Sequence, residues 1–248
     1  MSGHSKWSSI KHKKGALDAK RGKIFTKLIR EITVASRDGG GDPDINPRLR
    51  LALLNARSAI MPKDTSERAI KKGSGELASD TYIETTYEGY GPGGTAVLVE
   101  VLTDNKNRTV SELRRAFSKF GGNLGESGCV SWIFNKKGKF EVPIKSIEED
   151  SLIDLSLDLG ADDVINDGEV FLVLTEVDKF EEVRKGLEES NVDFENAEIS
   201  MIPSNSVKVE GKPAEHMLKM LDLLDDCDDV QKVHSNFDID DSVIEALI

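Results

Sequence analysis

Lysine and arginine crowd the first thirty residues of the chain, at a density that suits contact with a polyanion. The nine basic residues are Lys6, Lys11, Lys13, Lys14, Lys20, Arg21, Lys23, Lys27 and Arg30, against a single acid, Asp18. Cations at this density bind a phosphate backbone because each phosphate they neutralise releases a condensed counterion. Trp7 and His12 are interleaved with the lysines, and an aromatic ring can stack on an unpaired base. The segment is therefore predicted to contact nucleic acid.

A predicted helix over 16–36 would arrange part of this charge on one face. Ile24, Leu28 and Ile32 recur at helical spacing and form an apolar stripe that can pack on the rest of the domain. The cations on roughly the opposite side of the helix are Lys20, Lys23, Lys27 and Arg30. Arg21 falls on the apolar side, so either the helix begins after it or Arg21 has a specific partner.

A plainer interpretation of the same residues needs no nucleic acid. The basic helix face could be solvated surface, and Trp7 could be a plug that packs on the helical domain. The scarcity of acids in this segment favours nucleic-acid contact over that alternative.

A second group of cations surrounds a helix predicted to begin near Thr109. Its members are Lys106, Arg108, Arg114, Arg115 and Lys119. Backbone amides at a helix N-terminus favour anions, and the polar loop at 104–108 is suited to hydrogen bonding. Ordinary surface charge beside a helix cap explains this second basic patch equally well, so both interpretations remain.

Signals of catalysis are missing from the sequence. Gly89, Gly91 and Gly94 match the letters of a dinucleotide fingerprint, but they precede a predicted strand instead of leading from a strand into a helix. A tight turn, or a close approach of the backbone to a partner, explains them better. The four histidines lack the spacing of paired metal ligands, and the aspartates around Cys227 lack the pattern of a calcium loop. We expect no catalytic residues, metal, cofactor or small-molecule substrate.

The net charge of −12 over 248 residues conceals a steep gradient along the chain. Residues 1–75 carry a net charge of +10, whereas residues 140–248 carry −22. Such asymmetry is typical of a separate basic binding module joined to acidic domains. The composition, 38% apolar and 31% charged, suits small domains with much surface better than one large core.

Cysteine usage and the N-terminal sequence indicate a cytoplasmic protein. Cys129 and Cys227 form no CxxC motif, and two reduced thiols fit a reducing compartment. The opening MSGHSKW has no apolar stretch of a secretory signal. The longest aliphatic or aromatic run, at 170–174, is far shorter than the ~20 residues of a membrane span. We expect no membrane partner, and the oligomeric state is left open.

Hydrophobic periodicity predicts a helical N-terminal part followed by strands. The predicted helices lie at 16–36, 47–60, 64–73 and 109–120, and the predicted strands of this half lie at 81–88, 95–103 and 129–134. Asp64 with Glu67, and Thr109 with Glu112, resemble capping boxes that would open the third and fourth helices.

The second half completes an α+β fold class. Residues 138–202 predict the order β-α-β-β-α-β of ferredoxin-like domains, with a hairpin turn at Asp167 and Gly168. A helix at 213–224 and a strand at 230–237 could complete the sheet that begins at Thr81. The predicted organisation is an N-terminal helical domain followed by two ferredoxin-like α+β domains, one inserted in the other. Their ranges are 1–75, 80–135 plus 204–240, and the inserted 136–203.

Several long motifs resemble the YebC/PmpR family, whose mitochondrial relatives act as translational activators, those of cytochrome oxidase among them. The motifs include GHSKW at 3–7, AKRGKIFTKLIREI at 19–32, MPKDTSERAIKKG at 61–73, YEGYGPGG at 87–94, LTDNKNRTV at 102–110 and AFSKFGGNLGESG at 116–128. They follow the family's order, and the acidic half fits in length and pattern. Cys129 stands where a small hydroxyl residue or alanine is more usual.

The resemblance implies three domains and a non-enzymatic cytoplasmic regulator of gene expression. The family's basic helix corresponds to Lys20, Arg21, Lys23, Lys27 and Arg30, and its GHSKW arm to Lys6 and Trp7. Bacterial members are generally described as transcriptional regulators that bind DNA. The alternative is a ribosome-associated translation factor that relieves stalling at proline-rich stretches. Phosphate attraction cannot separate promoter DNA from ribosomal RNA, and the linker at 39–43 is long for a helix-turn-helix, which slightly favours RNA or non-specific contact.

Overall fold

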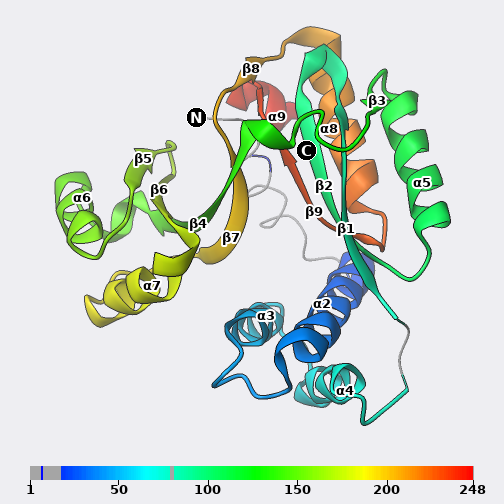
Figure 1. Ribbon diagram of the computed structural model, residues 1–248. Helices are drawn as coiled ribbons and strands as arrows, with labels where there is room; N and C mark the ends of the chain where they lie inside the picture. Colours follow the sequence, from blue (N-terminus) through cyan, green and yellow to red (C-terminus); the bar gives the residue numbers. More distant parts are fainter. Residues whose placement is uncertain (1–6, 8–17, 79–80, 248) are drawn as a thin grey trace.

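The computed structural model describes Trp7, residues 18–78 and residues 81–247. These residues form a group of three helices and two four-stranded antiparallel sheets with helices packed against them (Figure 1). The α+β class predicted from the sequence is therefore confirmed. The predicted contact residues Lys6, Lys11, His12, Lys13 and Lys14 lie outside the described residues.

The helical group consists of α2 (Asp18–Gly39), α3 (Pro47–Ser58) and α4 (Lys63–Gly73), close to the predicted ranges. Both α3 and α4 pack mainly on α2. Asn46 holds the entry to α3, because its side-chain oxygen accepts from the Leu49 N–H at 3.0 Å while its amide donates to the carbonyls of Ala35 and Gly40. The small core between the three helices contains Ile32, Ala35, Leu49, Ala52, Ala56, Met61 and Ala69.

Both predicted capping boxes are wrong, because each helix begins earlier than its box. Helix α4 starts at Lys63 after Pro62, with no side-chain cap, so Asp64 lies inside its first turn. Helix α5 (Lys106–Lys119) is capped by Asn105, whose side chain accepts from the Arg108 N–H. The Thr109 hydroxyl turns instead toward Thr103 and Asp229.

The first sheet is assembled from distant parts of the sequence. Its order is β3 (Asn123–Leu124), β1 (Ile83–Tyr90), β2 (Ala96–Thr103) and β9 (Val230–Ser235). Alternate residues of β2 point into a core shared with α5 and α8 (Gly211–Asp225), as the period of two requires. The chain then ends with α9 (Asp241–Leu247), after the short parallel pair β8 (Val207–Lys208) and β10 (Phe237–Asp238).

The second sheet uses one continuous stretch of the chain. Its order is β5 (Asp163–Asn166), β6 (Val170–Thr175), β4 (Phe134–Pro143) and β7 (Asn196–Pro203), with α6 (Glu149–Asp158) and α7 (Phe180–Glu189) as crossovers. This is the ferredoxin-like arrangement predicted from the sequence. The predicted hairpin is also present, because β5 and β6 pair across Asp167 and Gly168, and Gly168 has a φ of 86°.

The two sheets have the same spatial order, with one strand permuted in sequence. The strands β3, β1, β2 and β9 occupy the places of β5, β6, β4 and β7, although β1 precedes β2 along the chain. The whole second sheet lies in sequence between β3 and α8. On this topology we propose the domain division 1–75, 80–135 plus 204–240, and an inserted 136–203.

The glycine-rich segment after β1 is a turn. Residues Pro92–Gly94 form a short 3-10 turn between β1 and β2, with φ of 79° at Gly93 and 76° at Gly94. Left-handed backbone of this kind favours glycine. The context of a dinucleotide-binding loop is therefore absent here.

The strand predicted at 129–134 is wrong. Ser131–Ile133 forms a 3-10 turn, and β4 begins only at Phe134. The cause is Glu88, a buried residue on β1 whose carboxylate accepts backbone N–H groups of Gly128, Val130 and Ser131 at 2.7–2.8 Å. Two of the N–H groups that a strand at 129–134 could use for pairing are bound to this side chain instead.

Candidate nucleic-acid interface

The cations along the described part of α2 face an acidic segment of the same chain. This acidic run, Asp225, Asp226, Asp228 and Asp229, follows α8 and leads into β9. Lys23 Nζ lies 3.0 Å from Asp226 Oδ1, and Lys27 Nζ lies 3.6 Å from Asp225 Oδ1. In Figure 1 the first turns of α2 accordingly lie beside the end of α8.

Arg30 makes the most buried of these contacts. Its Nη1 donates to Asp229 Oδ1 at 2.7 Å and to the backbone carbonyls of Leu102 and Asp228. Its guanidinium carbon also lies 5.3 Å from the ring centroid of Tyr82, a cation–π distance. Arg30 therefore joins the helical group to the first sheet.

Asp229 is the centre of a buried polar cluster. Its carboxylate accepts hydrogen bonds from Arg30, from Arg108 Nη2 at 2.9 Å, from Thr109 Oγ1 at 2.7 Å and from Thr103 Oγ1 at 3.1 Å. Burial alone would raise the pKa of this carboxyl. The hydrogen bonds from Thr109, Arg108 and Arg30 outweigh burial and hold its pKa below the ordinary value.

These contacts correct one expectation about the basic helix. The face with Lys23, Lys27 and Arg30 was predicted to present its cations to solvent, but the structure sets each of them against a carboxylate. A phosphate would have to displace the carboxylates in order to bind there. Lys20 and Arg21 lie in the first turn of α2, and their side chains are outside the described part of the chain. Their contact with nucleic acid stays a prediction.

Trp7 does not have the role predicted for it. Its side chain is 3% exposed and belongs to the core of the first sheet, with Val97, Phe117 and Met217 among its members. A ring buried in this way cannot stack on a base. It also packs on the α+β domain, and not on the helical domain as the alternative interpretation required.

The second basic patch, on α5, has a different environment from the cations of α2. Lys106, Arg114, Arg115 and Lys119 are exposed, and within the described residues none of them makes an ion pair. Arg108 is the exception, since it binds Asp104 at 2.7 Å as well as Asp229.

The outward side of α5 is polar along its whole length. Its inward side buries Thr109, Leu113, Ala116 and Phe117. The exposed residues between the cations include Asn107, Ser111 and Ser118, which can hydrogen-bond to phosphate oxygens. The one acid of this helix, Glu112, accepts a hydrogen bond from the Cys227 thiol at 2.9 Å. The helix thus offers cations and hydrogen-bonding groups together.

A groove of about 580 Å³ separates the two basic helices. Its cations are Lys23, Arg30 and Arg108, but five carboxylates line it as well: Asp104, Glu112, Asp226, Asp228 and Asp229. Burial, with the hydrogen bond to Glu112 as a smaller cause, raises the pKa of the Cys227 thiol to about 12. While these carboxylates are in place the groove does not suit an anion, and its thiol is not a reactive nucleophile.

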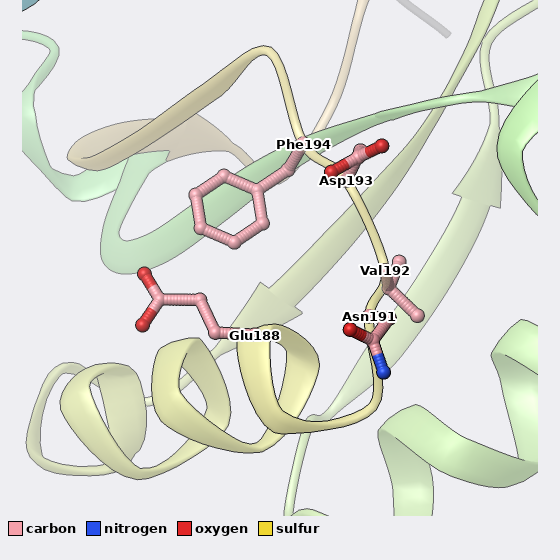
Figure 2. A pocket seen from close by; sticks show the side chains of 5 residues that line it. All are labelled: Glu188, Asn191, Val192, Asp193 and Phe194. Carbon is pink, nitrogen blue, oxygen red and sulfur yellow. The ribbon is translucent and has the colours of Figure 1, made fainter.

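A second hollow, of about 420 Å³, lies where α7 turns toward β7. Figure 2 shows the Phe194 ring and the Glu188 carboxylate facing the same space, with Asn191 and Val192 at the turn. Among the described residues that line it, the charged ones are Glu188 and Asp193, both acidic. Acidic walls of this kind do not suit a phosphate.

Two exposed aromatic side chains are a feature that the sequence analysis missed. Trp132 is 72% exposed and Tyr90 is 42% exposed. The Trp132 Nε1–H and the Tyr90 hydroxyl both donate to the Cys129 carbonyl, at 3.2 and 3.0 Å. Trp132 alternates with Val130 and Phe134 in the sequence, so the apolar period of two gave no signal of its exposure.

Neither a metal centre nor a membrane span is evident in the described part of the chain. Within it, no group of three or more His, Cys, Asp or Glu side chains is placed to hold a metal ion. Among the described helices, none is both long enough and apolar enough to span a bilayer.

The fold is that of an α+β protein with a helical group and two ferredoxin-like sheets. Its basic helices form a candidate surface for a polyanion. The chain belongs to the TACO1/YebC family: the model of its N-terminal domain matches residues 5–76, and that of its second and third domains matches residues 82–237.

Relatives with the same length support this assignment. A probable transcriptional regulatory protein of Geobacter sp. strain M21 is 60% identical, and one of Geobacter sulfurreducens is 58% identical, each over the whole of both chains. The crystal structure of a conserved hypothetical protein from Aquifex aeolicus has a TM-score of 0.83 and 48% identity. That match covers 90% of this chain and 93% of the other.

Proposed function

We propose that this protein is a non-enzymatic cytoplasmic regulator of gene expression that binds nucleic acid, with DNA at promoters as the first candidate target. The single observation that carries the proposal is the outward face of α5, where Lys106, Arg114, Arg115 and Lys119 are exposed without a carboxylate partner among the described residues. The relatives' printed name, probable transcriptional regulatory protein, agrees with this role.

The charge on α5 suits phosphates better than base edges. Arginine and lysine on an exposed helix neutralise a backbone, and the positive end of the helix dipole at Lys106 adds to the attraction. Because α5 lies flat against its sheet through Leu113 and Phe117, only one side of it can reach a ligand. The contact would therefore position the protein on the nucleic acid without reading its sequence.

The second candidate function, an RNA- or ribosome-associated translation factor, is favoured by the packing of the helical group. In a helix-turn-helix, the two helices pack against each other across a short turn. Here α3 and α4 both pack mainly on α2, although only four residues separate them. A base-reading element is thus not evident among the described helices.

The test is a titration of the full chain with a DNA duplex of about 20 base pairs and with an RNA stem-loop, at several salt concentrations. The variant Arg114→Glu, Arg115→Glu and Lys119→Glu should bind at least tenfold more weakly. The slope of log K against log salt should flatten by about 0.9 for each duplex phosphate that the variant no longer neutralises.

A matched control separates local contact from net charge. Lys145, Lys185 and Lys212 are exposed and lie outside α5, so their replacement by glutamate makes the same change in charge. Equal losses of affinity in the two triple variants would overturn the role of α5. Tighter binding of RNA than of DNA at matched salt would favour the translation factor.

A further inference from the structure

The acidic run sits where helix electrostatics opposes it. The last carbonyls of a helix carry partial negative charge, so acids at this end are repelled by the helix as well as by one another. Asp225 is the final residue of α8, Asp226 is its C-cap, and Asp228 follows after Cys227. Clustered acids at the C-terminus of a helix are stabilised by nearby cations, and the cations here are on α2.

The ion pairs along this contact differ sharply in exposure. At the inner end, the side chains of Arg30 and Asp229 are only 12% and 3% exposed. At the outer end, those of Lys23 and Asp226 are 43% and 60% exposed, and the pair Lys27–Asp225 is intermediate. Exposed pairs are weak and screened by salt, whereas a buried, multiply bonded pair is fixed. The contact between α2 and the acidic run is therefore fixed at the Arg30–Asp229 end, and it can exchange at the Lys23–Asp226 end.

We propose that Asp225 and Asp226 act as built-in counter-charges, which cover Lys23 and Lys27 of α2 until a polyanion displaces them. This inference rests on the proposed function and concerns the regulation of the same basic surface. Two carboxylates on successive residues present negative charge to α2 as successive phosphates would. The fixed pair of Arg30 and Asp229 keeps the segment in place during the exchange.

The masking has a measurable consequence for binding. The double variant Asp225→Asn and Asp226→Asn removes the two carboxylates that a phosphate would have to displace from Lys23 and Lys27. The full-length variant should bind a DNA duplex of about 20 base pairs roughly two- to tenfold more tightly than the unaltered chain, since two weak pairs no longer compete. Removal of Lys23 and Lys27 by glutamine substitution in the same background should abolish this gain.

The control pair is Asp154 and Asp158 on α6. Both are exposed, α6 lies away from α2 (Figure 1), and their change to asparagine alters the net charge by the same amount. Thermal unfolding of each variant checks that the fold is retained. A gain confined to the Asp225/Asp226 variant supports the masking.

Equal affinities among the unaltered chain and both double variants would overturn the masking and leave the proposed function standing. Equal gains in the two variants would also overturn it, because net charge alone would explain them. An absence of binding by all three proteins at low salt would overturn the proposed function together with the masking.

Discussion

Arg30 and Asp229 are joined at 2.7 Å although 199 positions separate them in the sequence. The bond ties α2 to the residue just before β9, the strand that completes the first sheet. Because Arg108, Thr103 and Thr109 converge on the same carboxylate, the junction between the helical group and the sheet is organised around one aspartate.

Replacement of Asp229 by alanine should destabilise the protein severely. Removal of this acid takes the shared carboxylate away from Arg30, Arg108 and two buried hydroxyls, and breaking a buried pair in this way costs about 3–5 kcal/mol. Urea unfolding at neutral pH measures the loss. The matched variant Asp226→Asn removes an exposed pair and should change the free energy of unfolding by about 1 kcal/mol or less. Similar losses in the two variants would contradict the central role of Asp229.

The free energy of unfolding should decrease at acidic pH. Burial opposes ionisation of Asp229, Glu88 and Glu100, but hydrogen bonds and nearby cations outweigh it and hold all three pKa values below their usual range. A lowered pKa in the folded state means that the unfolded chain takes up protons first. The stabilisation is therefore complete above about pH 5 and is lost as the pH falls from there toward 2.

Urea midpoints measured between pH 7 and pH 3 test this dependence. The Asp229→Asn variant should lose less of its stability over this range than the unaltered chain, because one of the titrating carboxyls is gone. The exposed-residue variant Asp154→Asn is the control and should follow the unaltered curve. A flat profile for the unaltered chain would show that these carboxylates do not stabilise the fold.

The two tryptophans should report opposite environments. Trp7 is 3% exposed and Trp132 is 72% exposed. Emission from the Trp132→Phe protein, which retains only Trp7, should be blue-shifted and resistant to acrylamide. Emission from the Trp7→Phe protein should be red-shifted and readily quenched. Efficient quenching of Trp7 would mean that its ring is free after all, as the stacking interpretation assumed.

The helices and most strands could be predicted because their signals are local. The apolar spacing of Ile24, Leu28 and Ile32 marks α2 without any knowledge of its partners. The discontinuous first sheet could also be predicted from the sequence. The β-β-α-β pattern after Thr81 is incomplete, so it required a further helix and strand from later in the chain. The helices and strands depend on residues close together in the chain. The insertion follows because the first sheet would otherwise lack a strand.

The environment of the basic residues could not be predicted, because it depends on contacts between distant segments. Charge density along residues 1–30 is the same whether Lys23 faces solvent or Asp226, and only the packing of α8 against α2 decides between them. The burial of Trp7 has the same origin. The error at 129–134 also comes from a long-range contact, because the Glu88 carboxylate on β1 accepts the Val130 N–H.

The interrupted first sheet has a consequence for the newly synthesised chain. Strand β2 ends at Thr103, but its neighbour β9 begins only at Val230. At synthesis rates of roughly 5–20 residues per second, one edge of β2 waits on the order of ten seconds for its partner. The stretch from β4 to β7 pairs within itself and can fold during that interval. The order of emergence thus leaves an open strand edge on the nascent chain, a place where aggregation or chaperone capture competes with folding.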